Sequence, residues 1–418
     1  MKAGRTIAEI SRVAGVSGQN MHHYISNSPW SGPKVISDAR IEITTHAHFA
    51  SGSVLIGDES ADARGGEVLV GGARQYNGRL GKVDLSQVGV FLSIAKDGKH
   101  NWLDGELFLP EHWFDDEHQA LRQRVGVPEE RQFQTKIELF WQLVVRCQKE
   151  GVVFDAVAVD GLYGQSFWLR QKMDQAHIEF YADIPANSKV YLSEPVIGIP
   201  QHKRGPKAQK KKVLSPMAYR VENLPKHPTL LWQTLTIRPT ERGWLTADFA
   251  RLPVWTVQDD LTVTKQWLLI RRQGKKHTFS FSNAPAHTSL LTMASRKTQR
   301  FFIERDNQEA KSEFGWDEIQ TTSFLAWQHQ LAFTVLAQWF ITQTRLDWEE
   351  QSDRDPQLFQ RYELSLLPAL SVANVRELLR SALPLPALSP LAAASLVVEH
   401  LDNRSRSRKS RILNLSDP

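Results

Sequence analysis

The sequence predicts a mixed α/β protein, with a mixed sheet covered by helices. Short β-branched runs separated by glycine-rich turns, at Val54–Asp58, Glu67–Gly72 and Val88–Ile94, are typical of antiparallel strands. A helical pattern at Phe133–Lys149 is followed by the nearly continuous apolar run Val152–Asp160, which is how a buried central strand reads. Strands first, then strand, helix and strand, indicate a mixed sheet with helices packed on it.

The second half of the chain repeats both patterns. Gln165–Gln175 predicts a helix and Ile178–Ile184 a strand. Further strands are expected at 234–238, 244–252, 266–272 and 277–283, followed by helices at 290–314 and 323–344. A proline-rich linker at 382–390 and a short helix at 391–401 precede the C-terminal tail.

The N-terminal residues predict two short helices joined by a tight turn. Ile7 and Ile10 begin an apolar helical spacing, Gly15 ends the first helix, and Ser17 can cap the second. This is a helix-turn-helix arrangement, although a plain helical hairpin packed on the main domain gives the same pattern. In the first interpretation four side chains face a DNA groove: Gln19, Asn20, His22 and His23.

Composition excludes several classes of protein. With 41% hydrophobic and 23% charged residues in 418, the chain is an ordinary folded protein of two or three domains. It has no run of eighteen apolar residues and no secretory signal at its start, so we expect a cytoplasmic protein that does not span a membrane. Cys147 is the single cysteine, which excludes an intrachain disulfide framework and any cysteine-cluster metal site.

The net charge of +5 conceals two basic stretches. Gln201–Val213 and Arg404–Arg411 hold eleven of the 51 basic residues and no acidic ones, so acids outnumber bases in the rest of the chain. Such arms suit DNA phosphates. The candidate contacts are Lys203, Arg204, Lys210, Lys211, Lys212, Arg404, Arg406 and Arg408.

Removing residues 404–418 should weaken DNA binding and make its salt dependence shallower, because fewer counterions are released. A salt titration of DNA binding measures this, and an unchanged slope would exclude the tail as a DNA contact.

Three acidic residues form the candidate site. Asp58 and Asp160 end predicted strands, where a rigid sheet can hold carboxylates at its rim, although a single acid there is more often a loop cap. Glu304 shares a helix face with Arg300 and Lys311, a pattern that also describes a solvated ion-pair stripe. Three carboxylates suit Mg²⁺, with Mn²⁺ as an alternative, and two such ions can activate an attacking hydroxyl and stabilise the leaving oxygen.

These residues lie within segments that resemble the DDE transposases of the insertion sequence 701 family, a branch of the insertion sequence 4 superfamily. The resemblance runs in order along most of the chain. It is carried by Ile25–Trp30, Leu55–Ser60, Ala73–Phe91, Leu107–Trp113, Phe133–Leu139, Val157–Gly164, Phe281–Pro285 and Arg300–Glu318.

The resemblance implies a site and a reaction. Asp58, Asp160 and Glu304 correspond to the catalytic and metal-binding triad, which would hold two Mg²⁺ ions for strand cleavage and strand transfer. Arg300 and Lys311 would contact DNA phosphates or hold Glu304 in place. Lys297 stands where the superfamily pattern has tyrosine. The implied partners are double-stranded DNA, both element ends and target, and a second copy of the chain in a dimer at the bacterial nucleoid.

The resemblance also implies a ribonuclease-H-like core interrupted by a β-rich insertion. We therefore expect five segments: 1–45 helical and DNA-binding, 46–189 the first part of the core, 190–288 the insertion with its basic arm, 289–345 the helices carrying Glu304, and 346–418 a helical region with the basic tail. Two other functions stay open. One is a decayed or repurposed transposase that binds DNA without cleavage, and the other is a ribonuclease-H-like nuclease that acts without element ends.

Tryptophan residues are expected mostly in the core. Trp102, Trp113 and Trp244 lie within apolar strand patterns. Trp316 and Trp327 flank the last predicted catalytic helix, where one of them could stack on a flipped base instead.

Overall fold

The structure is a computed structural model, and it describes residues 6–66, 68–78, 80–200, 209–240, 243–354 and 370–382. Contacts divide the chain into two units, residues 1–369 and 370–418. In the second unit the described residues form helix α12 (Val372–Ala382). The linker, the short helix and the basic stretch predicted beyond residue 382 lie outside the described residues.

The sheet of the first unit has a mixed centre. Its central strands are β1 (Val54–Ala63), β3 (Lys82–Lys96), β4 (Lys99–Phe108), β5 (Ala156–Val159) and β6 (Phe180–Ile184). They lie in the order β4-β3-β1-β5-β6, with β5 parallel to both β1 and β6 and β3 antiparallel to β1 and β4. The mixed α/β class and the ribonuclease-H-like core are confirmed.

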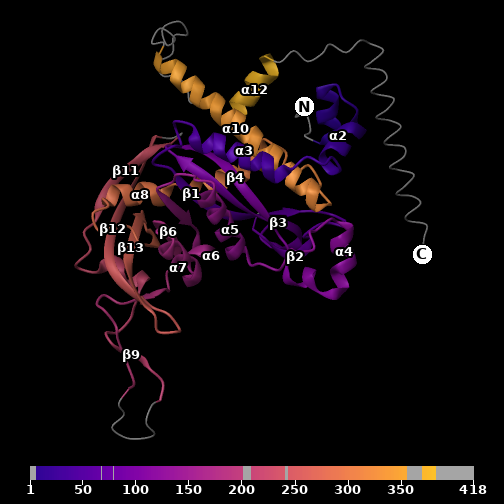
Figure 1. Cartoon of the computed structure of the whole chain (residues 1–418). Helices are drawn as coiled ribbons and strands as arrows, with labels where there is room; N and C mark the ends of the chain where they lie inside the picture. Colours follow the sequence, from indigo (N-terminus) through magenta and orange to yellow (C-terminus); the bar gives the residue numbers. More distant parts are fainter. Residues whose placement is uncertain are drawn as a thin grey trace. The chain divides into compact units, whose positions relative to one another are not determined.

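The predicted β-rich insertion continues this sheet. Its elements are β7 (Lys189–Val190), β8 (Val196–Gly198), β9 (Lys212–Ser215), β10 (Tyr219–Arg220), the 3-10 helix η3 (Val221–Lys226), β11 (Gln233–Thr240), β12 (Gly243–Val257), β13 (Val263–Gln273) and β14 (Lys276–Ser282). β14 pairs antiparallel with β6, and β13, β12 and β11 follow outward from it (Figure 1). β8 and β9 form a separate ribbon.

Helices cover both faces of the central sheet. Those that matter for the site are α3 (Gly32–Thr45), α5 (Lys136–Lys149), α6 (Gly161–Gly164), α7 (Phe167–Gln175), α8 (Leu290–Thr298), α9 (Phe301–Ser312) and α10 (Phe324–Arg354). Phe140 of α5 packs on Gly57, where a Cβ atom would lie 2.0 Å from its ring. Since side chains alternate along a strand, the neighbouring Asp58 points to the opposite face, where α9 packs on β1.

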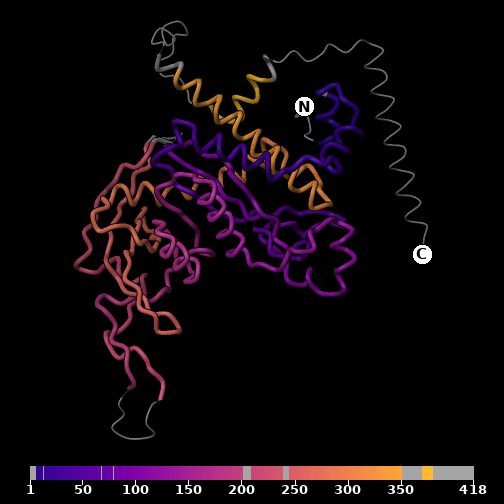
Figure 2. Tube along the Cα trace, in the orientation of Figure 1, coloured from indigo at the N-terminus to yellow at the C-terminus, as the bar shows by residue number. Residues whose placement is uncertain are grey.

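The N-terminal helices begin and end as the sequence predicts. α1 (Ile7–Ala14) has a capping box between Thr6 and Glu9 and ends at Gly15, whose φ of 67° favours glycine. The Ser17 side chain caps α2 (Gly18–Ser26). α2 and α3 both contact α10, the long helix near the C-terminal end of the first unit. The N-terminal segment therefore packs along this helix (Figure 2). The side chains proposed to face DNA are exposed: Gln19, Asn20, His22 and His23.

Three details of the sequence prediction were wrong. Residues 68–72 form a turn, because Gly71 has a positive φ and the Val70 N–H donates to the Thr322 carbonyl. The helix expected over 290–314 breaks after Thr298 into α8 and α9. Trp244, expected in the core, is 66% exposed.

Trp316 and Trp327 belong to the core, which corrects the suggestion that one of them stacks on a flipped base. Each is 2% exposed, and the Trp316 ring packs edge-on against Phe91 and Trp102. The remaining short elements are β2 (Ala73–Asn77), η1 (Glu111–Phe114), η2 (Asp116–His118) and α4 (Gln119–Arg124). Among the described residues, no helix is long and apolar enough to cross a membrane.

Candidate active site

The two predicted aspartates lie at neighbouring parallel strands, but the prediction that Asp58 ends its strand was wrong, because β1 continues past it to Ala63. Gly57 of β1 is in register with Val159 of β5, so the residues that follow them, Asp58 and Asp160, share one position of the sheet. Asp160 comes directly after its strand and caps α6, because its Oδ1 accepts hydrogen bonds from the backbone N–H groups of Leu162 (2.9 Å) and Tyr163 (3.3 Å). The cap fixes the Asp160 carboxylate at the rim of the sheet.

The half-buried Asp58 carboxyl lies near two other carboxylates. Burial, together with the carboxylates of Asp160 and Glu59, raises the pKa of Asp58 to about 8. Burial also raises the pKa of Asp160. The positive charge of Arg300 offsets part of both shifts. A pair of carboxyls in this state is stabilised by any further cation that reaches it.

Glu304 joins the two aspartates through Arg300. Arg300 lies at the break between α8 and α9, and Glu304 is in the first turn of α9. The guanidinium Nη2 lies 2.8 Å from Glu304 Oε1, and its charge also acts on Asp58 and Asp160. Arg300 is therefore ion-paired with Glu304, and its positive charge reaches both aspartates. The break that sequence periodicity missed is what places Arg300 among them.

Asp183 is the site residue that the sequence interpretation missed. It lies on β6, two strands from β1, and its carboxylate pairs with Lys297 Nζ (3.1 Å) and Arg300 Nε (3.4 Å). Ser280 of β14 donates a hydrogen bond to Asp183 Oδ1 (2.5 Å). The sequence did contain a signal for this residue. The predicted strand Ile178–Ile184 is the next strand after the one that precedes Asp160, and the acidic Asp183 lies near its end.

Lys297, which replaces the tyrosine of the superfamily pattern, is a buried countercharge to Asp183. Its side chain is 9% exposed, and burial lowers its pKa while the Asp183 carboxylate opposes the shift. The Asp183 carboxylate thus holds the last turn of α8 and the start of α9 against the sheet.

Lys311 has an internal partner at the other end of α9. Its Nζ lies 2.8 Å from Asp62 Oδ1 and donates to the Ala61 carbonyl (2.9 Å). Asp62 also accepts a hydrogen bond from Trp316 Nε1 (2.6 Å). With its side chain 13% exposed, Lys311 anchors α9 to β1. Of the two roles considered for Lys311, these contacts support holding the helix in place.

The basic arm is described only at its end. Lys210, Lys211 and Lys212 are exposed where the chain enters β9. Lys203 and Arg204 lie outside the described residues, as do Arg404, Arg406 and Arg408.

The donor set fits a hard divalent cation. Asp58 and Asp160 lie at adjacent strands, Glu304 is paired with Arg300, and the charge of Arg300 offsets only part of the raised pKa of Asp58. Carboxylate oxygens are the ligands that Mg²⁺ and Mn²⁺ prefer. Oxygens of these three carboxylates do not lie within 4.8 Å of one another in the described chain, so side chains would have to move closer together to hold one ion jointly.

Ion binding at this site should depend on pH. A raised pKa means that Asp58 holds its proton at neutral pH, and the proton competes with the cation for the same oxygens. Affinity for Mn²⁺ or Mg²⁺ is therefore expected to rise by about tenfold per pH unit up to about pH 8 and then to level off. Calorimetric titrations across this range test it, with Asp58→Asn as the variant whose pH dependence flattens. Equal affinity of the wild-type chain on both sides of neutrality would contradict it.

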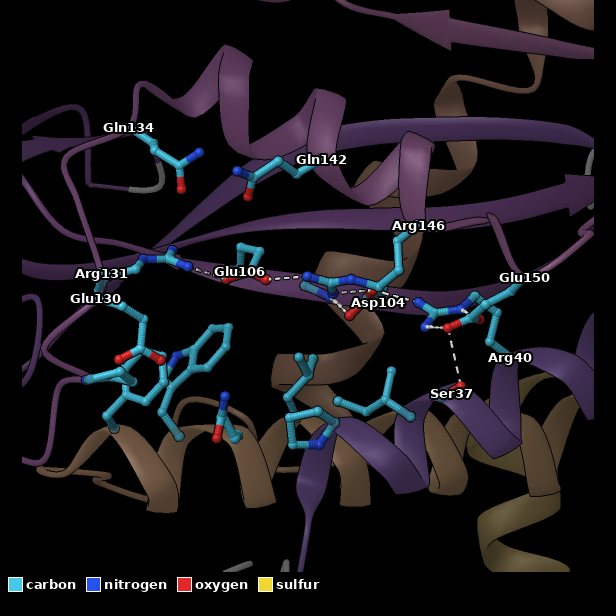
Figure 3. Close-up of a pocket in the computed structure, with 18 of the residues that line it drawn as sticks. Ser37, Arg40, Asp104, Glu106, Glu130, Arg131, Gln134, Gln142, Arg146 and Glu150 are labelled. Carbon is cyan, nitrogen blue, oxygen red and sulfur yellow. Dashed lines mark hydrogen bonds and ion pairs between the residues drawn. The ribbon is translucent and has the colours of Figure 1, made fainter. Parts of the chain in front are cut away.

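A second polar cavity lies apart from these residues. It has a volume of about 660 Å³ between α3, β4, α5 and the start of α10, and none of the three candidate carboxylates lines it. Figure 3 shows that six of its charged side chains are paired with one another: Asp104 with Arg40 and Arg146, Glu106 with Arg131 and Arg146, and Glu150 with Arg40. This network ties α3 and α5 to β4, while Glu130, which also lines the cavity, is joined to none of these residues.

Comparison with known proteins identifies the class. The DDE superfamily endonuclease family matches residues 1–243, more than half of the chain, and this chain belongs to that family. It is also similar to a protein of Microchaete diplosiphon described as a probable transposase for insertion sequence element IS701. The two are 29% identical over 163 residues, which is 39% of each chain, so the match spans about two fifths of that protein's length. The resemblance predicted from the sequence is confirmed.

Proposed function

We propose that the chain is the transposase of an insertion sequence, and that it cleaves and joins DNA strands with Asp58, Asp160 and Glu304. The observation that carries the proposal is the register of β1 and β5, which brings Asp58 and Asp160 together, beside the Arg300–Glu304 ion pair, whose arginine charge reaches both aspartates. Family membership supports endonuclease chemistry, and the similarity to a probable transposase supports its use in transposition.

In the proposed mechanism, the chain's main task is to position and neutralise charge. Asp58, Asp160 and Glu304 would hold one or two Mg²⁺ ions, which supply charge stabilisation at the scissile phosphate and lower the pKa of an attacking hydroxyl. β1 and β5 fix two of the carboxylates, and the α6 cap orients Asp160. Arg300 has a guanidinium between Asp183 and Glu304. If Glu304 bound a cation instead, the Arg300 guanidinium would be available to bind a phosphate oxygen.

DNA contact is proposed for the exposed basic residues rather than for Lys311. Lys210, Lys211 and Lys212 lead into the β8–β9 ribbon, and the tail beyond residue 403 carries the second basic stretch. The exposed polar face of α2 is a further candidate. The proposal includes four further points. The chain would bind element ends and target DNA, assemble as a dimer and act at the nucleoid, and it would be organised in the five segments predicted from the sequence.

A cleavage assay with Mg²⁺ on DNA carrying the element's own end tests the proposal. The wild-type chain should cut at the end, unrelated duplexes should stay intact, and Asp160→Ala should be inactive. Identical behaviour of wild type and Asp160→Ala would exclude the catalytic assignment. Binding of the end without any cleavage would favour the repurposed DNA-binding protein, and equal cutting of unrelated duplexes the general nuclease.

A further inference from the structure

A cluster of three potential ligands lies away from the DDE carboxylates, between β4 and α9. One nitrogen of His100, on β4, and one carboxylate oxygen each from Asp306 and Glu309, on α9, all lie within 4.8 Å of one another. Asp306 and Glu309 are three residues apart, so the helix presents both on one face. The two elements meet here in the folded chain, because α9 packs on β4.

The cluster is buried and one of its oxygens lacks a partner. The side chains of His100 and Asp306 are 5% and 2% exposed, and His100 Nδ1 lies 2.7 Å from Asp306 Oδ1. The other oxygen, Asp306 Oδ2, is buried and accepts no hydrogen bond in the part of the chain that the structure describes. Leaving a buried carboxylate oxygen without a partner is costly, and a cation removes that cost.

The surroundings hold the three groups in place. The His100 ring stacks on Phe302, with ring centroids 4.9 Å apart, and the His100 carbonyl accepts a hydrogen bond from Thr342 of α10. Burial raises the pKa of Glu309. Arg305 lies 3.4 Å from Glu309 and is its surface-side partner, and the charge of Arg345 also reaches it. These arginines balance the acids in part, but neither is bonded to Asp306 Oδ2.

We propose that His100, Asp306 and Glu309 form a second cation site, which takes a divalent transition-metal ion such as Zn²⁺. An imidazole nitrogen with two carboxylates is a donor set for Zn²⁺ rather than for Mg²⁺, which prefers oxygen ligands alone. Three protein ligands from a strand and a helix would fasten α9 to β4. The ion would thereby fix the helix that carries Glu304, without touching the reacting groups.

Zinc binding to the full chain tests the proposal. Asp58→Asn/Glu304→Gln serves as the background, because it removes two carboxylates of the DDE site. Equilibrium dialysis with Zn²⁺ alone should show one bound ion per chain in this background, and Zn²⁺ should raise its melting temperature. Adding Glu309→Gln should weaken Zn²⁺ binding at least about tenfold. Glu313→Gln, the same change at the end of the same helix, should leave binding within about twofold.

A spectroscopic readout keeps the test independent of any loss of stability in the variants. Co²⁺ added to the wild-type chain should give visible absorption from a nitrogen-and-oxygen site, and excess Mg²⁺ should not remove it. Absence of Zn²⁺ binding in the background chain, binding that Glu309→Gln leaves unchanged, or a Co²⁺ signal that Mg²⁺ displaces would each overturn the proposal. The cluster would then be a buried His–Asp ion pair with Glu309 beside it.

Discussion

Replacement of Glu304 by glutamine should abolish strand cleavage and leave DNA binding nearly intact. The substitution keeps the size of the side chain and a hydrogen-bonding oxygen for Arg300, but it removes one of the three negative charges that would hold the catalytic cations. Cleavage should fall by about three orders of magnitude or more, since the chemistry rests on charge stabilisation at the phosphate. Single-turnover cleavage and electrophoretic binding assays on the same end DNA measure the two effects separately.

Two comparisons make this result specific. Glu304 is 50% exposed, so its replacement should not lower stability, and an unchanged urea unfolding curve checks this. Glu313→Gln at the end of the same helix should retain full cleavage. A large loss of DNA binding in Glu304→Gln would mean that Glu304 is structural, which contradicts its assignment to the triad.

Replacement of Lys311 by alanine should destabilise the fold rather than weaken DNA contact. It removes the cation from Asp62, a carboxylate that is 5% exposed and stays buried on β1. Breaking one side of a buried pair typically costs about 3–5 kcal/mol, because the remaining carboxylate stays buried without its paired cation. Urea unfolding of the two chains, followed by intrinsic fluorescence, measures the difference in the free energy of unfolding.

A matched lysine separates the two roles. Lys210→Ala, at an exposed position before β9, should leave stability unchanged and weaken DNA binding modestly. In the Asp62→Asn background the cost of Lys311→Ala should shrink, since the buried negative charge is already gone. If Lys311→Ala left stability intact and lowered DNA binding, Lys311 would be a phosphate contact after all.

The apolar runs of the sequence predicted the central strands better than the contacts between them. Asp58 follows such a run but lies within β1, which continues to Ala63, whereas the place of Asp160 directly after β5 could be read from local pattern. The partners of Arg300 and Lys311 could not, because Asp183 and Asp62 are 117 and 249 positions away along the chain and only the fold brings them near. The missed break at Arg300 has a similar cause, since local pattern continues smoothly through it.

The pairing of β14 with β6 has a consequence for how the molecule can be divided. β6 is at once the last strand of the catalytic core and the strand on which the insertion is built. Excising the insertion would uncover a row of backbone N–H and C=O groups along β6 and remove Ser280 from Asp183. A core trimmed in this way would carry an unpaired sheet edge next to Asp183 and the groups that pair with it.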